Sequence, residues 1–238
     1  GIRGTGKTST ARIISKGVNC IGEDGNGSLT TEPCGKCEHC ESISNGRHVD
    51  VFEMDAASKT GVADIREIIE SVQYRATSAR FKIYIIDEVH MLSNSAFNAL
   101  LKTLEEPPAH AIFILATTEK HKIIPTILSR CQIFDFKRIG VMDIKNYLHF
   151  IAKDEKIEAE DDALHIIALK ADGALRDALS IFDRVVSYSG NTLTRKAVSE
   201  NLNVLDHDEY FQVTDLLLDN NIPQILISLN NIMTKGFE

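Results

Sequence analysis

Two continuous apolar runs, "KIYIID" at 82–87 and "AIFILATT" at 111–118, constrain the fold more than any other feature of the chain. Neither run alternates between apolar and polar residues, and continuous runs of this length are typical of parallel strands covered on both faces. Two further segments, "VFEMD" at 51–55 and "QIFDF" at 132–136, also have the composition of strands. The four segments together predict a largely parallel sheet.

Helical patterns separate these strands. Residues 8–20 follow a glycine-rich loop, and residues 61–72 place their apolar side chains on one face. Residues 93–106 begin with a Ser or Asn cap and end before Pro107. Strands that alternate with helices predict an α/β fold.

After Arg138 the pattern becomes helical throughout, with no strand signal. Amphipathic helices are predicted at 141–155, 159–171, 174–189, 195–203, 208–220 and 222–235. We therefore expect three regions: an α/β domain at 1–138, a helical domain at 139–203, and the incomplete start of a third helical unit at 204–238.

Composition excludes several classes of protein. The 238 residues carry a formal net charge of -8, which argues against a surface coated in charge for binding nucleic acid. The apolar runs are too short to span a membrane, and the first residues do not resemble a signal peptide. Five cysteines without a secretory signal indicate a reducing compartment, where clustered cysteines favour a metal over disulfides.

The opening residues, "GIRGTGKT", fit the phosphate-loop pattern GxxxxGK[ST] at Gly1, Gly6, Lys7 and Thr8. Glycines let the backbone N–H groups face phosphate oxygens, the lysine reaches the β- and γ-phosphates, and the threonine hydroxyl ligates magnesium. The plainer alternative is a glycine-rich turn before a helix. The strand that normally precedes this loop would lie before residue 1, so we expect a fragment of a longer protein that lacks its first strand.

Acidic and hydroxyl side chains stand at two strand ends. Asp87 ends the strand at 82–87 and Glu88 follows it, at the place where a nucleotide site needs a magnesium carboxylate and a base that activates water. Thr117 and Thr118 end the next strand, where a hydroxyl can orient that water or simply cap the strand. We expect His90 to be structural.

Two arginines are candidates for stabilising phosphate charge. Arg130 lies in "SRC" between a helix and the strand predicted at 132–136, and Arg176 opens the helix at 174–189. Either arginine alone is most often part of a surface ion pair. However, an arginine from a neighbouring domain or subunit often stabilises the charge that develops on phosphate.

Three cysteines, Cys34, Cys37 and Cys40, are each separated by two residues, and Cys20 precedes them at the end of the first helical pattern. Four thiolates give a closed tetrahedral site that suits structural zinc. The alternatives are His39 in place of one cysteine, an iron–sulfur cluster, or free thiols. We expect the fifth cysteine, Cys131, to be buried by packing.

The motifs "GIRGTGKT", "IYIIDEVH", "ILATT", "SRC" and "GALRDALS" together resemble AAA+ ATPases of the clamp-loader clade. Longer stretches, including "RFKIYIIDEVHMLSNSAFNALLKTLEEPP", resemble the bacterial DNA polymerase III gamma/tau subunits. The resemblance implies a P-loop AAA+ domain with an inserted zinc module at 20–40, followed by a helical lid.

The resemblance also implies roles for single residues. Asp87 would bind magnesium, Glu88 would be the catalytic base, and Thr118 would be the first sensor. Arg130 would act in trans on ATP in the next subunit, and Arg176 would be the second sensor. The phosphate loop would be formed by Gly4, Thr5, Gly6, Lys7, Thr8 and Ser9.

In that family ATP binding lets a pentameric ring hold the sliding clamp, and primer-template DNA triggers hydrolysis. The resemblance thus implies ATP, Mg²⁺ and Zn²⁺ as cofactors and a cytoplasmic, nucleoid-associated replisome as the location. By position in the motifs, Lys59, Lys102 and Thr126 are candidates for contacting the DNA backbone. The alternatives are a branch-migration helicase, a non-hydrolysing scaffold subunit and a zinc-dependent DNA-binding module.

Overall fold

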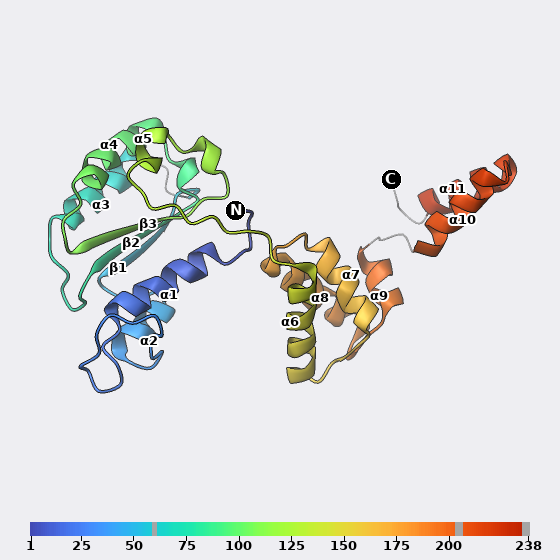
Figure 1. Cartoon of the computed structure of the whole chain (residues 1–238), viewed down its shortest axis with the longest axis horizontal. Coiled ribbons are helices and arrows are strands. Elements are labelled where there is room, and N and C mark those ends of the chain that lie inside the picture. Colours follow the sequence, from blue (N-terminus) through green and yellow to red (C-terminus); the bar gives the residue numbers. More distant parts are fainter. Residues whose placement is uncertain (59–60, 203–206, 235–238) are drawn as a thin grey trace. The chain divides into compact units, whose positions relative to one another are not determined.

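The computed structural model describes residues 1–58, 61–202 and 207–234. The chain divides into two compact units, Gly1–Lys137 and Arg138–Glu238 (Figure 1).

The sheet of the first unit contains β1 (Val51–Asp55), β2 (Lys82–Asp87) and β3 (Ala111–Leu115) in the order β1-β2-β3. Both pairings are parallel, and their register sets Asp55 opposite Asp87. The parallel sheet predicted from the sequence is therefore confirmed for these three strands. Because the strands run in one direction, the residues that follow them gather at one edge of the sheet.

Helices cover both faces of this sheet, which explains the continuous apolar run in β2. Ile83 and Ile85 pack with Ala11 of α1 (Lys7–Asn19) on one face. Ile86 packs on the other face with α3 (Val62–Val72) and α4 (Asn94–Glu105). Figure 1 shows α1 on one side of the strands and α3 and α4 on the other.

The ends of α4 follow from its sequence. The Ser93 side chain accepts a hydrogen bond from the Ala96 N–H at 3.3 Å, which satisfies a backbone donor of the first turn. The helix ends at Glu105, shortly before Pro107, because proline cannot continue it. The shorter helices of the first unit are α2 (Glu38–Ser44), η1 (Val89–Met91), η2 (Lys120–Lys122) and α5 (Pro125–Leu128).

The strand predicted at 132–136 is wrong. These residues are all described, and they form no strand. A strand needs a neighbour that completes its backbone hydrogen bonds, and within the described residues β3 pairs with β2 alone. Ile133 and Phe134 are accordingly exposed, at 45% and 69%.

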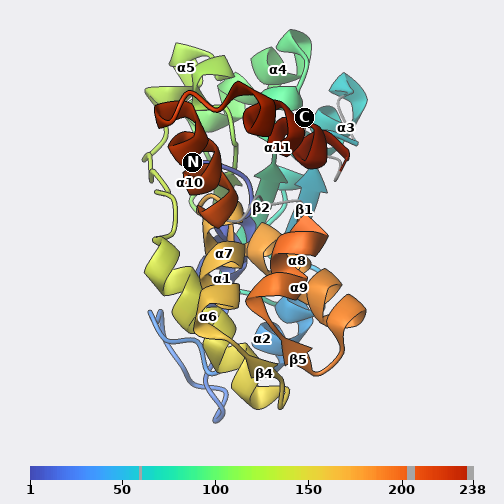
Figure 2. The same ribbon diagram turned by 90° about the vertical axis from the view of Figure 1, so that its right-hand side faces the viewer.

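The second unit is helical, as the sequence predicts. Its core is built from residues such as Ile144, Leu164 and Val185 on successive helices, and Figure 2 shows α7, α8 and α9 gathered together. α10 and α11 contact each other. The helices are α6 (Val141–Asp154), α7 (Asp161–Lys170), α8 (Leu175–Ser189), α9 (Arg195–Leu202), α10 (His207–Leu218) and α11 (Ile222–Thr234).

One pair of short strands in this unit contradicts the expectation that strands are absent after Arg138. β4 (Glu158–Ala159) and β5 (Thr192–Leu193) pair in parallel. Two residues are too few to produce an alternating pattern, so no periodicity in the sequence marks them. Among the described helices, none is long and apolar enough to cross a bilayer.

Candidate active site

The phosphate loop depends on two glycines with a left-handed backbone. Gly4 has φ 75° and Gly6 has φ 86°, and other residues adopt such angles only with strain. A Cβ at Gly6 would meet nothing within 4 Å, so the requirement there is conformational. The Thr5 hydroxyl donates a hydrogen bond to the Ile2 carbonyl at 3.0 Å and closes the loop.

Lys7 and the start of α1 bring positive charge to this loop. The Lys7 ammonium donates to the carbonyl oxygens of Ile2 at 2.7 Å and Gly1 at 3.3 Å, which holds it across the loop. The first turn of α1 contains no acidic residue, and Gly6 provides no side-chain cap. The backbone N–H groups of that turn therefore keep their positive partial charge for an anion.

Thr8 and Asp87 come together although 79 positions separate them in the sequence. The Thr8 hydroxyl donates to Asp87 Oδ2 at 2.5 Å, and Asp87 Oδ1 accepts from the Glu88 N–H at 2.9 Å. The contact joins the first turn of α1 to the carboxyl end of β2. Hydroxyl and carboxylate oxygens placed side by side are the ligand type that Mg²⁺ prefers, so this pair fits a magnesium ion.

Glu88 lies in the left-handed region, with φ 46° and ψ 43°, which is uncommon for a residue other than glycine. Its Oε2 atom accepts from the Thr118 N–H at 3.1 Å and from the Thr118 hydroxyl at 2.9 Å. Thr117 instead accepts from the Glu119 N–H at 3.0 Å and contacts the His90 ring. Of the two threonines considered from the sequence, Thr118 is the one that contacts Glu88.

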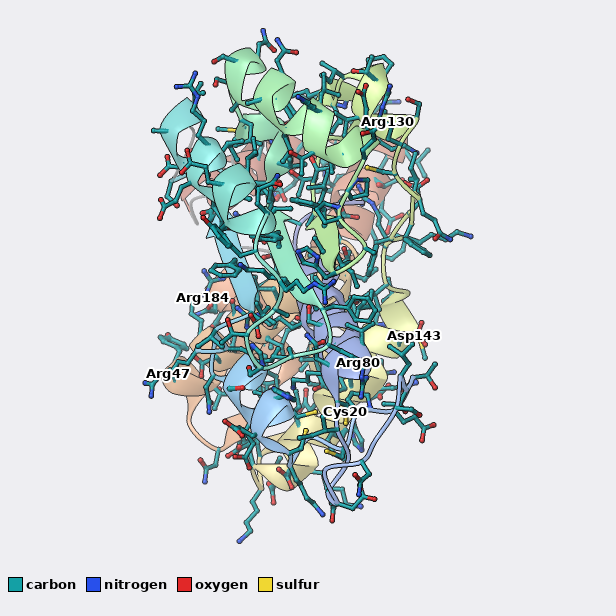
Figure 3. The ribbon with its side chains drawn as sticks, turned by 90° about the vertical axis from the view of Figure 1, so that its left-hand side faces the viewer. Cys20, Arg47, Arg80, Arg130, Asp143 and Arg184 are labelled. Atoms are coloured by element: carbon teal, nitrogen blue, oxygen red, sulfur yellow. The ribbon has the colours of Figure 1, made fainter. Side chains whose placement is uncertain are left out.

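Arg130 lies among α4 and α5, as Figure 3 shows. It forms an ion pair with Glu105 at 2.7 Å and donates to the Thr126 carbonyl at 2.6 Å. The guanidinium is thus held by the end of α4 and by α5 itself. Arg176, in contrast, belongs to the second unit, where it is exposed on the first turn of α8.

Two of the three candidates for DNA contact are exposed on helices of the first unit. Lys102 is exposed on α4, and Thr126 is exposed on α5. Lys59 lies outside the described residues.

The four clustered cysteines meet in space, with their Sγ atoms all within 4.8 Å of one another. Cys20 and Cys34 have their Sγ atoms 3.6 Å apart, too far for a disulfide. That distance is close to the edge of about 3.8 Å expected for a tetrahedron with Zn–S bonds of about 2.3 Å. Three of the cysteines are buried, and Figure 3 shows the sulfur atoms near Cys20. The cluster therefore fits a tetrahedral thiolate site.

Backbone donors support a negative charge on one of these sulfurs. The N–H groups of Cys34 and Gly22 lie 3.5 Å and 3.4 Å from Cys20 Sγ. The hydrogen bond from Cys34, together with that from Gly22, lowers the pKa of Cys20 to about 7 against the opposing effect of burial. Burial raises the pKa of Cys40 to about 12, so a cation is needed before that thiolate forms at neutral pH.

The hydrogen bonding of the His39 ring argues against His39 as a metal ligand. His48 Nδ1 accepts from the Asp50 N–H at 3.0 Å, so the proton of the neutral His48 ring is on Nε2. That proton is donated to His39 Nδ1, 2.8 Å away. Burial also lowers the pKa of His48, in keeping with a neutral ring. Cys131 is partly buried against the core of the first unit, and burial raises its pKa.

Three further residues contact the candidate site residues or their neighbours, although no sequence motif assigns them a function. His90 contacts Thr117 and Glu88, Glu105 pairs with Arg130, and Arg80 donates to the carbonyls of Val18, Cys20 and Gly27. No motif reveals these partners, because each contact joins segments that the chain brings together only on folding.

Comparison with known proteins first defines the class. The solved structure of the Thermotoga maritima RuvB Holliday junction branch migration motor matches this chain with a TM-score of 0.59. The match covers 97% of this chain and 72% of that one, at 18% sequence identity. At that identity the likeness concerns the fold alone. The chain therefore has the α/β fold of that motor, with a parallel sheet and a helical lid domain.

The family follows from the sequence. Residues 1–140 match the family model "DNA polymerase III, delta subunit", and residues 143–191 match "DNA polymerase III clamp loader subunit, ATPase lid domain". The chain belongs to this family of DNA polymerase III subunits, and its curated relatives carry the names gamma and tau.

Three relatives illustrate the similarity. The DNA polymerase III subunit tau of Salmonella typhimurium is 46% identical over 238 residues, which are all of this chain and 36% of that protein. The tau subunit of Bacillus subtilis is 47% identical over 99% of this chain and 41% of its own length. The gamma subunit of Buchnera aphidicola (Schizaphis graminum) is 44% identical over all of this chain and 64% of its own length. The chain thus spans less than two thirds of the length of these relatives.

Proposed function

We propose that the protein is an ATP-hydrolysing motor subunit of the bacterial replicative clamp loader, within the DNA polymerase III holoenzyme. Its role is to use ATP binding and hydrolysis to load the sliding clamp onto primer-template DNA. The observation that carries the proposal is the contact of 2.5 Å between Thr8 and Asp87, with Glu88 beside them. The names of the relatives and of the lid-domain model support the setting in replication.

The phosphate loop is proposed to bind the ATP phosphates. Residues Gly4 to Ser9 would surround them with backbone N–H groups, and Lys7 would exchange its bonds to Ile2 and Gly1 for phosphate oxygens. Thr8 and Asp87 would hold Mg²⁺. When bound, the ion supplies positive charge that neutralises the phosphates.

Glu88 is proposed as the general base that takes a proton from the attacking water. Glu88 directly follows Asp87 in the chain, and its backbone N–H donates to Oδ1 of the carboxylate that would hold the metal. Thr118, bonded to Glu88 Oε2 through both its N–H and its hydroxyl, would be the first sensor and orient the carboxylate.

Arg130 is proposed as a finger that stabilises phosphate charge on the neighbouring subunit. Its partner Glu105 is charged and partly exposed, so the guanidinium can exchange this ion pair for phosphate oxygens. Arg176, exposed on the lid unit, is proposed as the second sensor, which contacts the γ-phosphate of its own subunit.

The four cysteines are proposed to hold a structural zinc ion. Four thiolates leave no position open for catalysis, so the ion would fix the fold locally by joining the end of α1 to α2. Residues 204–238 are proposed to begin a third, oligomerising unit.

The proposed partners are the other subunits of a pentameric ring, the sliding clamp and primer-template DNA. Lys102 and Thr126, both exposed, would contact DNA phosphates, and Lys59 is proposed with them from its place in the motifs. Such contacts are independent of base sequence and weaken as the salt concentration rises. The proposed location is the cytoplasmic replisome.

The alternatives have less support. The likeness to a branch migration motor concerns the fold alone, and that class does not account for four clustered cysteines. A non-hydrolysing scaffold does not require Lys7, Asp87, Glu88 and Arg130 together. A zinc-dependent DNA-binding module is disfavoured by the net charge of -8.

Nucleotide binding and turnover by the Glu88→Gln variant of the full-length protein test the proposal. We expect the variant to bind ATP like the parent and to lose hydrolysis by about 100-fold or more, the usual contribution of a general base. Hydrolysis at the parent rate would exclude Glu88 as the base. Lys7→Ala is the companion variant, and it should lose ATP binding itself.

A further inference from the structure

The imidazole of His90 occupies a position that the proposed roles do not explain. It lies on η1, two residues after Glu88, and its side chain is only 6% exposed although carboxylates stand on both sides of it. A buried polar ring of this kind needs partners for both nitrogens.

Both nitrogens have partners, and the partners lie on different sides of the ring. Nδ1 is 2.9 Å from the Thr117 hydroxyl and 3.3 Å from Glu88 Oε2. Nε2 is 3.1 Å from Glu119 Oε2, and a carboxylate can only accept, so Nε2 carries a proton. In the neutral ring Nδ1 then accepts from the Thr117 hydroxyl and meets Glu88 Oε2 as a neighbour, whereas in the protonated ring Nδ1–H donates to Glu88 Oε2. One ring therefore links the proposed base to the segment that follows β3.

Backbone hydrogen bonds to the segments that follow β2 and β3 hold the main chain on either side of His90. The Val89 N–H donates to the Ala116 carbonyl at 3.0 Å, and the Met91 N–H donates to the Glu88 carbonyl at 2.8 Å. Glu119 is held in turn by Lys122, whose ammonium is 2.7 Å away. Hence the ring cannot shift without disturbing one of these bonds.

We propose that His90 is a positioning residue for hydrolysis, which acts through its Nδ1 side on the carboxylate of Glu88. Thr118 holds Glu88 Oε2 through two bonds, and Nδ1 of His90, whose ring is held by Thr117 and Glu119, lies 3.3 Å from the same oxygen. The inference rests on the proposed role of Glu88 as the base. A base must be held at the correct distance from its water, and small displacements cost large factors in rate.

Two substitutions separate this role from simple packing. In His90→Asn the side-chain amide falls near the former Nδ1 and can still contact Thr117 and Glu88. In His90→Gln the amide falls near the former Nε2, so it keeps the contact with Glu119 and fills more of the volume. A packing role favours His90→Gln, whereas the positioning role favours His90→Asn.

The experiment measures steady-state ATP hydrolysis and nucleotide affinity for the full-length protein assembled with its partner subunits. We expect His90→Ala and His90→Gln to lower kcat about tenfold with the ATP affinity unchanged, and His90→Asn to recover most of the loss. The same three substitutions at His149, which is exposed on α6, form the matched control and should leave kcat unchanged. Parental kcat in His90→Ala, or a better recovery by His90→Gln than by His90→Asn, would overturn the proposal.

A double-mutant cycle with Thr117→Val adds a second test. Since Thr117 and His90 are proposed to act on the same carboxylate, their losses should be clearly less than multiplicative. Fully multiplicative losses would contradict a shared action. The Glu88→Gln variant separates the proposed role of Glu88 from the proposed role of His90. If Glu88→Gln hydrolyses ATP normally, Glu88 is not the base. If Glu88→Gln is inactive and His90→Ala is normal, only the positioning role of His90 is wrong.

Discussion

Replacing Arg130 by alanine should separate folding from catalysis, because the structure gives this side chain a weak partner in its own chain. The ion pair with Glu105 is partly exposed, with side-chain exposures of 34% for Arg130 and 47% for Glu105. Exposed pairs of this kind contribute about 0.2 to 1 kcal/mol to the free energy of unfolding. An arginine that stabilises phosphate charge in trans contributes about 1,000-fold or more to the hydrolysis rate.

We therefore expect Arg130→Ala to unfold at nearly the parent temperature, to bind ATP normally, and to lose hydrolysis by about 1,000-fold in the assembled ring. Thermal unfolding, nucleotide binding and steady-state hydrolysis measure the three quantities. The control is Arg47→Ala, since Arg47 is an exposed arginine that Figure 3 shows well away from Arg130.

Mixed assemblies decide whether the effect is in trans. A ring that combines Arg130→Ala subunits with Lys7→Ala subunits should recover hydrolysis only at sites where an intact finger faces an intact phosphate loop. Full activity of Arg130→Ala in every assembly, or a loss that already occurs in ATP binding, would refute the reasoning.

Three further predictions concern the metal, the loop before β2 and the surface. The full-length protein should contain about one zinc per chain, and Cys40→Ser should lower both the zinc content and the unfolding temperature. If metal analysis of the folded protein finds no metal, the zinc site is excluded. Burial raises the pKa of Asp50, but hydrogen bonds from the N–H groups of residues 77–79 outweigh it and leave this pKa below its ordinary value of 3.8. The stability that Asp50 contributes is thus present above pH 3.8 and is lost as the pH falls through the lowered pKa. Asp50→Ala should therefore lower the free energy of unfolding by about 1 to 3 kcal/mol at pH 7 and by much less under strong acid. Denaturant unfolding measures both costs, and an equal cost at the two pH values would contradict this prediction. Lys102→Glu should weaken binding of primed DNA by the assembled protein and reduce its salt dependence, whereas an unchanged salt slope would remove Lys102 from the interface.

Much of the first unit was predictable because its signals are local. The apolar runs in β2 and β3 and the Ser93 cap of α4 reflect burial on two faces and a backbone donor satisfied within one turn. The segment 132–136 was not predictable, since its apolar composition suits a strand but within the described residues β3 pairs with β2 alone. Whether a segment becomes a strand depends on its neighbour as well as on its own residues.

The residues of the candidate site likewise include some that could be predicted from the sequence and some that could not. Motif spacing singled out Lys7, Thr8, Asp87 and the four cysteines as candidates, because the chemistry proposed for them requires particular residue types at particular positions. It could not distinguish Thr117 from Thr118, because both follow the same strand and only the folded chain shows which one contacts Glu88. The partners of Arg130 and Glu88 were missed for the same reason, since Glu105 and His90 are ordinary residues until folding brings them into contact.

The most direct test of the central claim is ATP hydrolysis by the full-length protein assembled with its partner subunits, measured with and without sliding clamp and primed DNA. We expect a rate that rises markedly when clamp and primed DNA are both present and that disappears in the Glu88→Gln assembly. A rate that is indifferent to clamp and DNA, or that persists in the Glu88→Gln assembly, would contradict the proposal that this chain is a clamp-loading motor.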